Sequence, residues 1–133
     1  MARMPTTTPT ILVVDDTPGC RLPMARMLRA NGFQTRTACD GREAFDGLSA
    51  DGAVPPDLIL LDLAMPVMDG PAFLTAVRGD PRWASVPVVV VSGEGPGALE
   101  AARRLGAVGA VAKGEFRVGE LLDLIRRHIK VCQ

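Results

Sequence analysis

Short runs of apolar residues recur along the chain, and segments with a helical spacing of apolar residues separate them. The runs lie at residues 11–14, 33–38, 58–61, 86–91 and 107–112. Three of them, ILVV, LILL and VPVVVV, are apolar at nearly every position, which is typical of strands buried on both faces of a parallel sheet. The run at 33–38 alternates instead, with polar side chains at Gln34 and Arg36, and we expect it to form an edge strand.

Four of the segments between and after these runs carry helix signals. Asp40 and Glu43 form a capping box ahead of one helix, and Pro71 suits the first position of the next. Another helix is expected at residues 98–105. The last has the clearest amphipathic stripe, made by Val118, Leu121, Leu122, Ile125 and Ile129.

The segment after the first run is harder to interpret, because it contains two prolines. Pro18 suits the first turn of a helix capped by Thr17, but Pro23 lacks an N–H and its ring conflicts with the carbonyl of Gly19. Two alternatives follow: the helix begins near Cys20, or its first turns are bent. The pair Asn31-Gly32 is expected to end it.

Strands and helices therefore alternate five times, which predicts an α/β fold with a parallel sheet and right-handed crossovers. A length of 133 residues suits a single domain. We expect residues 1–9 to be a flexible N-terminal tail and residues 10–133 to form the folded domain.

Composition excludes several classes of function. The formal net charge is zero, so nothing resembles the basic footprint of a nucleic-acid-binding protein. No apolar stretch approaches the roughly 20 residues of a membrane span, and the N-terminus lacks an apolar signal-peptide core. The three cysteines are too scattered for a disulfide framework or a zinc site. We expect a soluble cytoplasmic protein with free thiols.

Polar side chains follow the apolar runs at the point where each predicted strand ends. The first strand ends at Asp15 and Asp16, the third at Asp62, the fourth at Ser92 and the fifth at Lys113. Sites in open parallel sheets form at the carboxyl ends of the strands, so these groups are expected to meet at one edge. Taken singly, each has an ordinary explanation as a cap, a turn or a surface residue; together they indicate a site.

Three carboxylates at one edge would repel one another by on the order of 4 kcal/mol for each close pair. A divalent cation relieves that repulsion, and hard oxygen ligands without His or Cys favour Mg²⁺. Ser92 and Lys113 could then contact the oxygens of a phosphoryl group. Asp62, a single acid at the end of a central strand, is the best candidate to accept that group as an aspartyl-phosphate.

The segments VVDD, LILLDLAMPVMDG, VVVVSG and AVAKG resemble the receiver domains of two-component response regulators. The resemblance covers nearly the whole chain, and its most specific part is the segment from Asp62 to Gly70. It implies a flavodoxin-like (βα)5 fold with a central five-stranded parallel sheet of order 2-1-3-4-5.

The resemblance also implies roles for individual residues. By resemblance, Asp62 corresponds to the phosphoacceptor of the family. Asp16 and Asp62 correspond to its direct Mg²⁺ ligands. The backbone carbonyl of Ala64 corresponds to a third ligand, and Asp15 to a residue acting mainly through water.

Ser92 and Lys113 correspond to the pair that contacts the phosphoryl group. The implied donor is a phospho-histidine on a sensor histidine kinase or a histidine phosphotransfer protein. The implied outcome is altered binding to a downstream protein target.

The chain departs from the family at positions near this site. Gly114 follows Lys113 where receivers usually have a cis proline, so we expect a trans peptide there. Ala110 stands where receivers usually carry an aromatic side chain that couples to the Ser or Thr. Gly93 replaces the usual Ala. Any signal must therefore pass through loop and helix shifts near residues 92–99, or be weak.

Three functions compete. The first is the phosphorylatable receiver, which is not a metabolic enzyme. The second is a degenerate receiver that binds partners without phosphorylation. The third is an aspartate-nucleophile phosphohydrolase, which Ala64 disfavours because such enzymes commonly place a general acid two residues after the nucleophile. No output domain follows Gln133, so we expect either a stand-alone regulator or a receiver from a longer chain.

Overall fold

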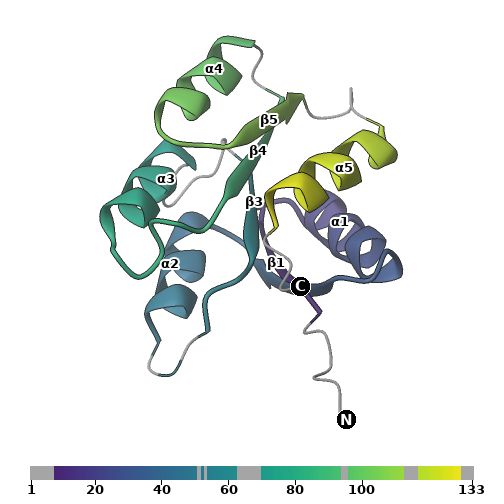
Figure 1. The fold of residues 1–133 in the computed structure, drawn as a ribbon, viewed down its shortest axis with the longest axis horizontal. Helices are drawn as coiled ribbons and strands as arrows, with labels where there is room; N and C mark the ends of the chain where they lie inside the picture. The colour runs from purple at the N-terminus through teal and green to yellow at the C-terminus, as the bar shows by residue number, and fades with distance from the viewer. Residues whose placement is uncertain are drawn as a thin grey trace, which may run out of the picture.

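The computed structural model describes residues 8–50, 52, 54–62, 70–93, 96–112 and 117–129. Within these residues, strands and helices alternate along the chain and form a helix–sheet–helix sandwich (Figure 1). The strands are β1 (Thr10–Val14), β2 (Gln34–Ala38), β3 (Leu58–Asp62), β4 (Val88–Ser92) and β5 (Gly109–Ala112). The helices are α1 (Pro18–Ala30), α2 (Gly41–Ser49), α3 (Gly70–Gly79), α4 (Pro96–Arg104) and α5 (Val118–His128).

The five strands are parallel and lie in the order β2-β1-β3-β4-β5, which confirms the predicted fold. Every residue of β3 and β4 is buried, as their continuous apolar runs predict. Strand β2 lies at one edge of the sheet and exposes Gln34, Arg36 and Thr37, which confirms the prediction from its alternating pattern.

Side chains alternate between two cores, one on each face of the sheet. Helices α1 and α5 cover the face reached by Val13, Leu60 and Val91. Helices α2, α3 and α4 cover the other face, where Val14 and Leu61 lie (Figure 1). This alternation determines which face each polar residue approaches when it follows a strand directly.

Helix α1 begins at Pro18, so the alternative of a start near Cys20 is wrong. The N–H of Cys20 already donates to the carbonyl of Thr17 at 3.0 Å, and the N–H of Arg21 donates to the same carbonyl at 2.8 Å. Thr17 occupies the cap position, but its side chain accepts no hydrogen bond from the first turn of the helix, and Pro23 lies inside the helix. The fixed φ of a proline at the first helical position explains why the helix can begin there.

The end of α1 confirms the interpretation of Asn31-Gly32. Gly32 has a φ of 93°, a conformation that glycine adopts readily. Its N–H donates to the carbonyl of Arg29 at 3.1 Å, and the N–H of Phe33 donates to that of Leu28 at 3.1 Å, which together form a Schellman motif.

The capping box ahead of α2 is confirmed, except that Glu43 bonds to the residue before the cap rather than to the cap residue itself. The carboxylate of Asp40 accepts a hydrogen bond from the N–H of Glu43 at 2.7 Å. The carboxylate of Glu43 reaches back to the N–H of Cys39 at 3.0 Å, one residue before the cap. Two N–H groups at this helix start are therefore satisfied.

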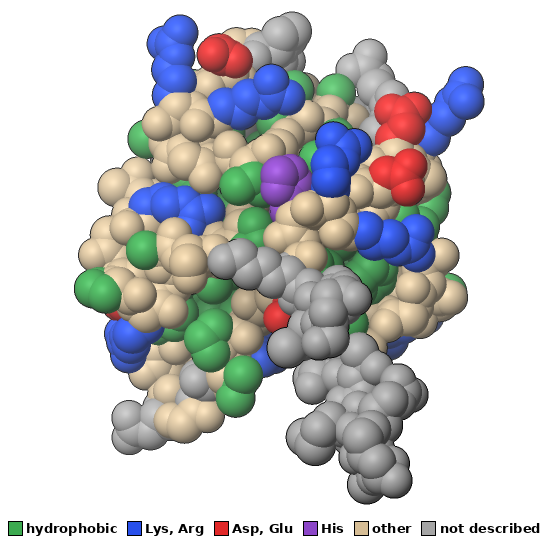
Figure 2. Space-filling model, viewed as in Figure 1, with side chains coloured by type: hydrophobic (Ala, Val, Ile, Leu, Met, Phe, Trp, Pro, Cys, Tyr) green, Lys and Arg blue, Asp and Glu red, His purple; other side chains and the backbone are tan. Residues whose placement is uncertain are grey.

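The surface carries both signs of charge. Figure 2 shows Lys and Arg side chains spread over one face of the molecule, with Asp and Glu side chains among them. None of the described helices is both long enough and apolar enough to cross a membrane.

Candidate functional site

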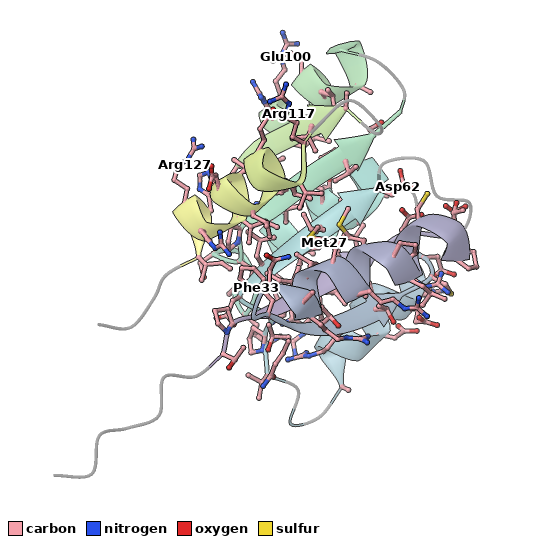
Figure 3. The ribbon with its side chains drawn as sticks, turned by 90° about the vertical axis from the view of Figure 1, so that its right-hand side faces the viewer. Met27, Phe33, Asp62, Glu100, Arg117 and Arg127 are labelled. Carbon is pink, nitrogen blue, oxygen red and sulfur yellow. The ribbon has the colours of Figure 1, made fainter. Side chains whose placement is uncertain are left out.

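Three aspartates meet at the carboxyl end of the sheet. Asp15 and Asp16 follow β1, and Asp62 ends the neighbouring strand β3, where Figure 3 labels it. Each of the three offers a carboxylate oxygen, and these oxygens lie within 4.8 Å of one another. The structure thus brings together the three acids that the sequence places at one edge.

The register of the sheet explains this meeting. Val14 pairs with Leu61, so the chain reaches Asp15 and Asp62 at the same level of two adjacent strands. By alternation, Asp15 and Asp62 approach the α1–α5 face with Val13, and Asp16 approaches the other side. Asp15 is 8% exposed and Asp62 is 5% exposed, whereas Asp16 is partly exposed.

Backbone and side-chain hydrogen bonds hold Asp15 in place. Its N–H donates to the carbonyl of Ala38 at 3.1 Å, which extends the pairing of β1 with β2 by one residue. Its carboxylate accepts from the N–H of Thr17 at 2.9 Å. The guanidinium of Arg21 donates to the main-chain carbonyl of Asp15 at 3.0 Å.

Arg21 is a residue of this site that no motif in the sequence indicates. It lies in the first turns of α1 and binds the loop that carries the acids. The only signal in the sequence is its spacing, because a helix that begins at Pro18 places Arg21 within one turn of that loop. The uncertain start of α1 conceals this signal.

The donor set fits a hard divalent cation. Carboxylate oxygens are the ligands that Mg²⁺ and Ca²⁺ prefer, and the cluster contains no softer ligand. Without a cation, each close pair of these carboxylates repels by on the order of 4 kcal/mol at an effective dielectric constant near 20. The cluster could therefore hold a metal ion.

Ser92 ends β4 and is fully buried, in register with Ala112 of β5. Its hydroxyl is therefore placed at the same end of the sheet as the acids, as the sequence predicts. Lys113, Ala64 and the peptide between Lys113 and Gly114 lie outside the described residues, so their predicted roles and geometry stay predictions.

Ala110 is half-buried and packs against the core on the α2–α4 face. Ala98 and Leu99 of α4 pack against the same core. The position where an aromatic side chain is usual in receivers thus holds one methyl group beside α4.

Comparison with known proteins identifies the class. Residues 11–126 match the family described as the response regulator receiver domain. The match covers most of the chain, so the protein belongs to this family.

Individual relatives agree with this assignment. The chain is 41% identical over 130 residues to protein-glutamate methylesterase/protein-glutamine glutaminase 1 of Anaeromyxobacter dehalogenans, covering 94% of this chain and 35% of that protein. It is 30% identical over 119 residues to sporulation initiation phosphotransferase F of Bacillus subtilis, covering 90% of this chain and 92% of that protein. It therefore spans about a third of the methylesterase and nearly all of the phosphotransferase.

Solved structures give the same result. The chemotaxis protein CheY4 of Vibrio cholerae superposes with a TM-score of 0.81 at 28% identity, covering 92% of this chain and 100% of that one. The receiver domain of NtrX from Brucella abortus gives 0.78 at 32% identity, covering 89% and 96%. The flavodoxin-like fold and the receiver-domain identity are both confirmed.

Family membership gives the chain a phosphoacceptor role in two-component signal transduction. Receiver domains take phosphoryl groups from histidine kinases or phosphotransfer proteins. The comparisons do not indicate the alternative of a degenerate receiver.

Proposed function

We propose that Asp62 is the residue that accepts the phosphoryl group. The observation that carries this proposal is the cluster of three carboxylates within 4.8 Å of one another, with Asp62 at the end of a central strand. A carboxylate oxygen of Asp62 attacks the phosphorus of a phospho-histidine, and the bond from phosphorus to the imidazole nitrogen breaks. The products are an aspartyl-phosphate and an imidazole that takes up a proton from solvent.

The neighbouring acids are proposed to serve a Mg²⁺ ion. Asp16 and Asp62 are its expected direct ligands with the carbonyl of Ala64, and Asp15 acts through water. When bound, the ion would offset the negative charge of the phosphoryl oxygens. The bond from Thr17 N–H to the Asp15 carboxylate keeps that carboxylate oriented toward the cluster before any ion arrives.

Ser92 and Lys113 are proposed to contact the phosphoryl oxygens. The buried position of Ser92 at the end of β4 supports this role, because its hydroxyl is shielded from water and close to the strand end that carries the acceptor. Since Ala110 supplies no ring beside α4, the response is proposed to pass through the segment that joins β4 to α4, around residues 92–99.

The proposed partners follow from this chemistry. The donor is a phospho-histidine on a sensor kinase or phosphotransfer protein, and the output is altered binding to a protein target in the cytoplasm. The chain then acts as a phosphorylatable switch that catalyses only its own phosphorylation and dephosphorylation, rather than as a metabolic enzyme.

The test is incubation with acetyl phosphate and Mg²⁺, followed by measurement of the intact mass. We expect a gain of one phosphoryl group in the wild type and in Asp46→Asn, which alters an exposed acid on α2. Asp62→Asn should show no gain. An unmodified wild type, or a modified Asp62→Asn variant, would contradict the assignment of Asp62.

A further inference from the structure

Arg21 contacts the loop between β1 and α1 through both its main chain and its side chain. Its N–H donates to the carbonyl of Thr17 at 2.8 Å, in the first turn of a helix that begins at Pro18. Its guanidinium donates to the carbonyl of Asp15 at 3.0 Å, and this bond is partly buried. One residue of α1 therefore holds two carbonyls of the loop that carries two of the acids.

The carbonyl that the guanidinium binds belongs to the peptide unit between Asp15 and Asp16. A peptide unit is planar, so a bond that orients its oxygen also fixes the position of the next Cα, which is that of Asp16. On the other side of Asp15, its N–H donates to the carbonyl of Ala38 at 3.1 Å. The backbone is thus held before and after Asp15, and Arg21 supplies the second of these two bonds.

The carboxylate of Asp16 has weaker support of its own within the described residues than that of Asp15. The Thr17 hydroxyl donates to the Asp16 carboxylate across a long 3.4 Å, and the Asp16 side chain is partly exposed. The Asp15 carboxylate accepts from the N–H of Thr17 at 2.9 Å, and Asp15 is 8% exposed. The position of Asp16 therefore depends mainly on the backbone before it, which Arg21 holds.

The charge of Arg21 and its hydrogen bond have opposite effects on a cation in the acidic cluster. The positive charge of the guanidinium repels a cation nearby, so its charge alone lowers the affinity for Mg²⁺. The bond to the Asp15 carbonyl instead raises this affinity, if it keeps Asp16 in the position that the cation requires. Removal of Arg21 therefore distinguishes the two effects by the sign of the change.

We propose that Arg21 is a positioning residue for the metal site. Its bond to the Asp15 carbonyl fixes the peptide that carries Asp16, and so prearranges Asp16 to bind the ion together with Asp62. This role rests on the proposed function, in which Asp16 and Asp62 are direct ligands. Groups that orient metal ligands without touching the metal typically contribute about tenfold to a hundredfold in metal affinity.

The first test measures Mg²⁺ binding by Arg21→Met, which keeps a long unbranched side chain but has neither donor nor charge. Mg²⁺ alone is titrated into the full chain, and the amide NMR signals of Asp15 and Asp16 are followed. We expect the dissociation constant to be at least about tenfold higher than in the wild type. An unchanged or lower dissociation constant would overturn the proposal, because loss of the charge alone predicts tighter binding.

Two further variants separate the hydrogen bond from other effects of α1. Arg21→Lys keeps an N–H donor, and since the bond to Asp15 comes from a single nitrogen, it should bind Mg²⁺ within about threefold of the wild type. Arg26→Met removes an exposed arginine from the same helix and should leave Mg²⁺ binding unchanged. If either variant weakens binding as much as Arg21→Met does, the bond to Asp15 is not the cause.

Amide hydrogen exchange tests the positioning itself in metal-free protein. The N–H of Thr17 donates to the Asp15 carboxylate, so its exchange rate reports opening of this loop. We expect the Thr17 amide to exchange at least about tenfold faster in Arg21→Met than in the wild type, and the amide of buried Leu60 on β3 to be unaffected. An unchanged rate at Thr17 would overturn the proposal, as would equal acceleration at Leu60, which would mean that Arg21 supports the whole fold.

Phosphorylation separates the role of Arg21 from that of Asp62. Wild type and Arg21→Met are incubated with acetyl phosphate over a range of Mg²⁺ concentrations. We expect Arg21→Met to need at least about tenfold more Mg²⁺ for half of its maximal rate, and to reach a rate within about twofold of the wild type at saturation. A lower saturating rate with an unchanged Mg²⁺ requirement would overturn the proposal.

The wild type distinguishes the two possible failures. If it is phosphorylated in an Mg²⁺-dependent manner and Arg21→Met has the same Mg²⁺ requirement, only the role of Arg21 is rejected. If the wild type is not phosphorylated and binds no Mg²⁺, the proposed function is rejected, and with it the metal site that Arg21 is proposed to serve.

Discussion

At the scale of single residues, the two adjacent acids after β1 are not equivalent. Asp15 is nearly buried and accepts a backbone hydrogen bond from Thr17, whereas Asp16 is partly exposed on the other side of the chain. The alternation of side chains along an extended chain predicts this difference from the sequence. Which of the two contacts a metal ion directly remains a prediction.

The backbone conformation and the surroundings of Gly106 disfavour any larger residue at that position. Gly106 lies two residues after the end of α4 and has a φ of 108°, and a Cβ at this position would lie 2.9 Å from Nε of Arg78. Arg78 is held there by bonds to the carbonyls of Gly106 at 3.3 Å and Ala84 at 2.7 Å. Gly106→Ala should therefore lower the free energy of unfolding by about 1–3 kcal/mol, measured by urea denaturation.

The matched control is Gly47→Ala in α2, where an added Cβ meets nothing within 4 Å. This change should raise the free energy of unfolding by about 0.5–1 kcal/mol, because alanine restricts the unfolded chain and favours helix. Effects of the same sign in the two variants would contradict the role assigned to the backbone of Gly106.

Asp80 should titrate abnormally. The Arg82 guanidinium donates to its carboxylate at 3.0 and 3.2 Å, and the Arg82 N–H donates at 2.9 Å. The side-chain bond from Arg82, followed by this backbone bond, lowers the pKa of Asp80 below its usual range. Because the folded-state pKa is lowered, the contribution to stability is present above the ordinary pKa of aspartate, about 3.9, and is lost as the pH falls through the folded-state value.

An NMR titration of the side-chain carboxyl carbons measures this pKa directly. Arg82→Gln removes the charged donor, and the Asp80 midpoint should then move upward toward the ordinary value. A midpoint that is the same in both proteins would show that Arg82 does not control this carboxyl.

At the scale of elements, the sequence predicts every described strand but misplaces some of their first residues. The runs at 86–91 and 107–112 correspond to β4 at Val88–Ser92 and β5 at Gly109–Ala112. Val86 and Ala107 are buried, yet their N–H groups bond to the carbonyls of Trp83 and Ala102 in the preceding turns. An apolar residue that packs a turn looks the same in sequence as one that begins a strand.

The start of α1 could not be predicted for a related reason. The cost of Pro23 can be estimated from the chain alone, but the packing and loop contacts that offset it depend on the folded sheet. The contact of Arg21 with the loop after β1 follows from where this helix begins. For that reason it is not visible in the sequence, although the three acids are.

Pro23 itself provides a test at this scale. Pro23→Ala restores an N–H that can donate to the carbonyl of Gly19, and it should raise the free energy of unfolding by up to about 2 kcal/mol. Pro18→Ala, at the first helical position, should instead leave stability unchanged or lower it slightly, since no intrahelical bond is gained there. Urea denaturation measures the free energy of unfolding of both variants. A lower value for Pro23→Ala than for the wild type would contradict the expectation.

At the scale of the whole molecule, the site depends on strand order. Asp16 and Asp62 are far apart in sequence and meet because β1 and β3 are neighbours in the order β2-β1-β3-β4-β5. Strand alternation alone predicts that polar groups share an edge, and the resemblance to receivers supplies the order that brings these acids together. The fold therefore concentrates negative charge at one edge, and it does so at a cost in stability.

That cost predicts how the whole protein responds to Mg²⁺. An ion that binds only the folded state at ten times its dissociation constant should raise the free energy of unfolding by about 1.4 kcal/mol. Asp16→Asn should respond less to Mg²⁺. In the presence of a chelator it should be more stable than the wild type by on the order of 1 kcal/mol, the water-screened value for a close pair of charges, because the carboxylate removed is partly exposed to solvent. Asp46→Asn, on the exposed side of α2, should respond to Mg²⁺ as the wild type does. Urea denaturation with Mg²⁺ or chelator gives both comparisons, and a wild-type midpoint that Mg²⁺ does not move would show that the three acids do not hold the ion.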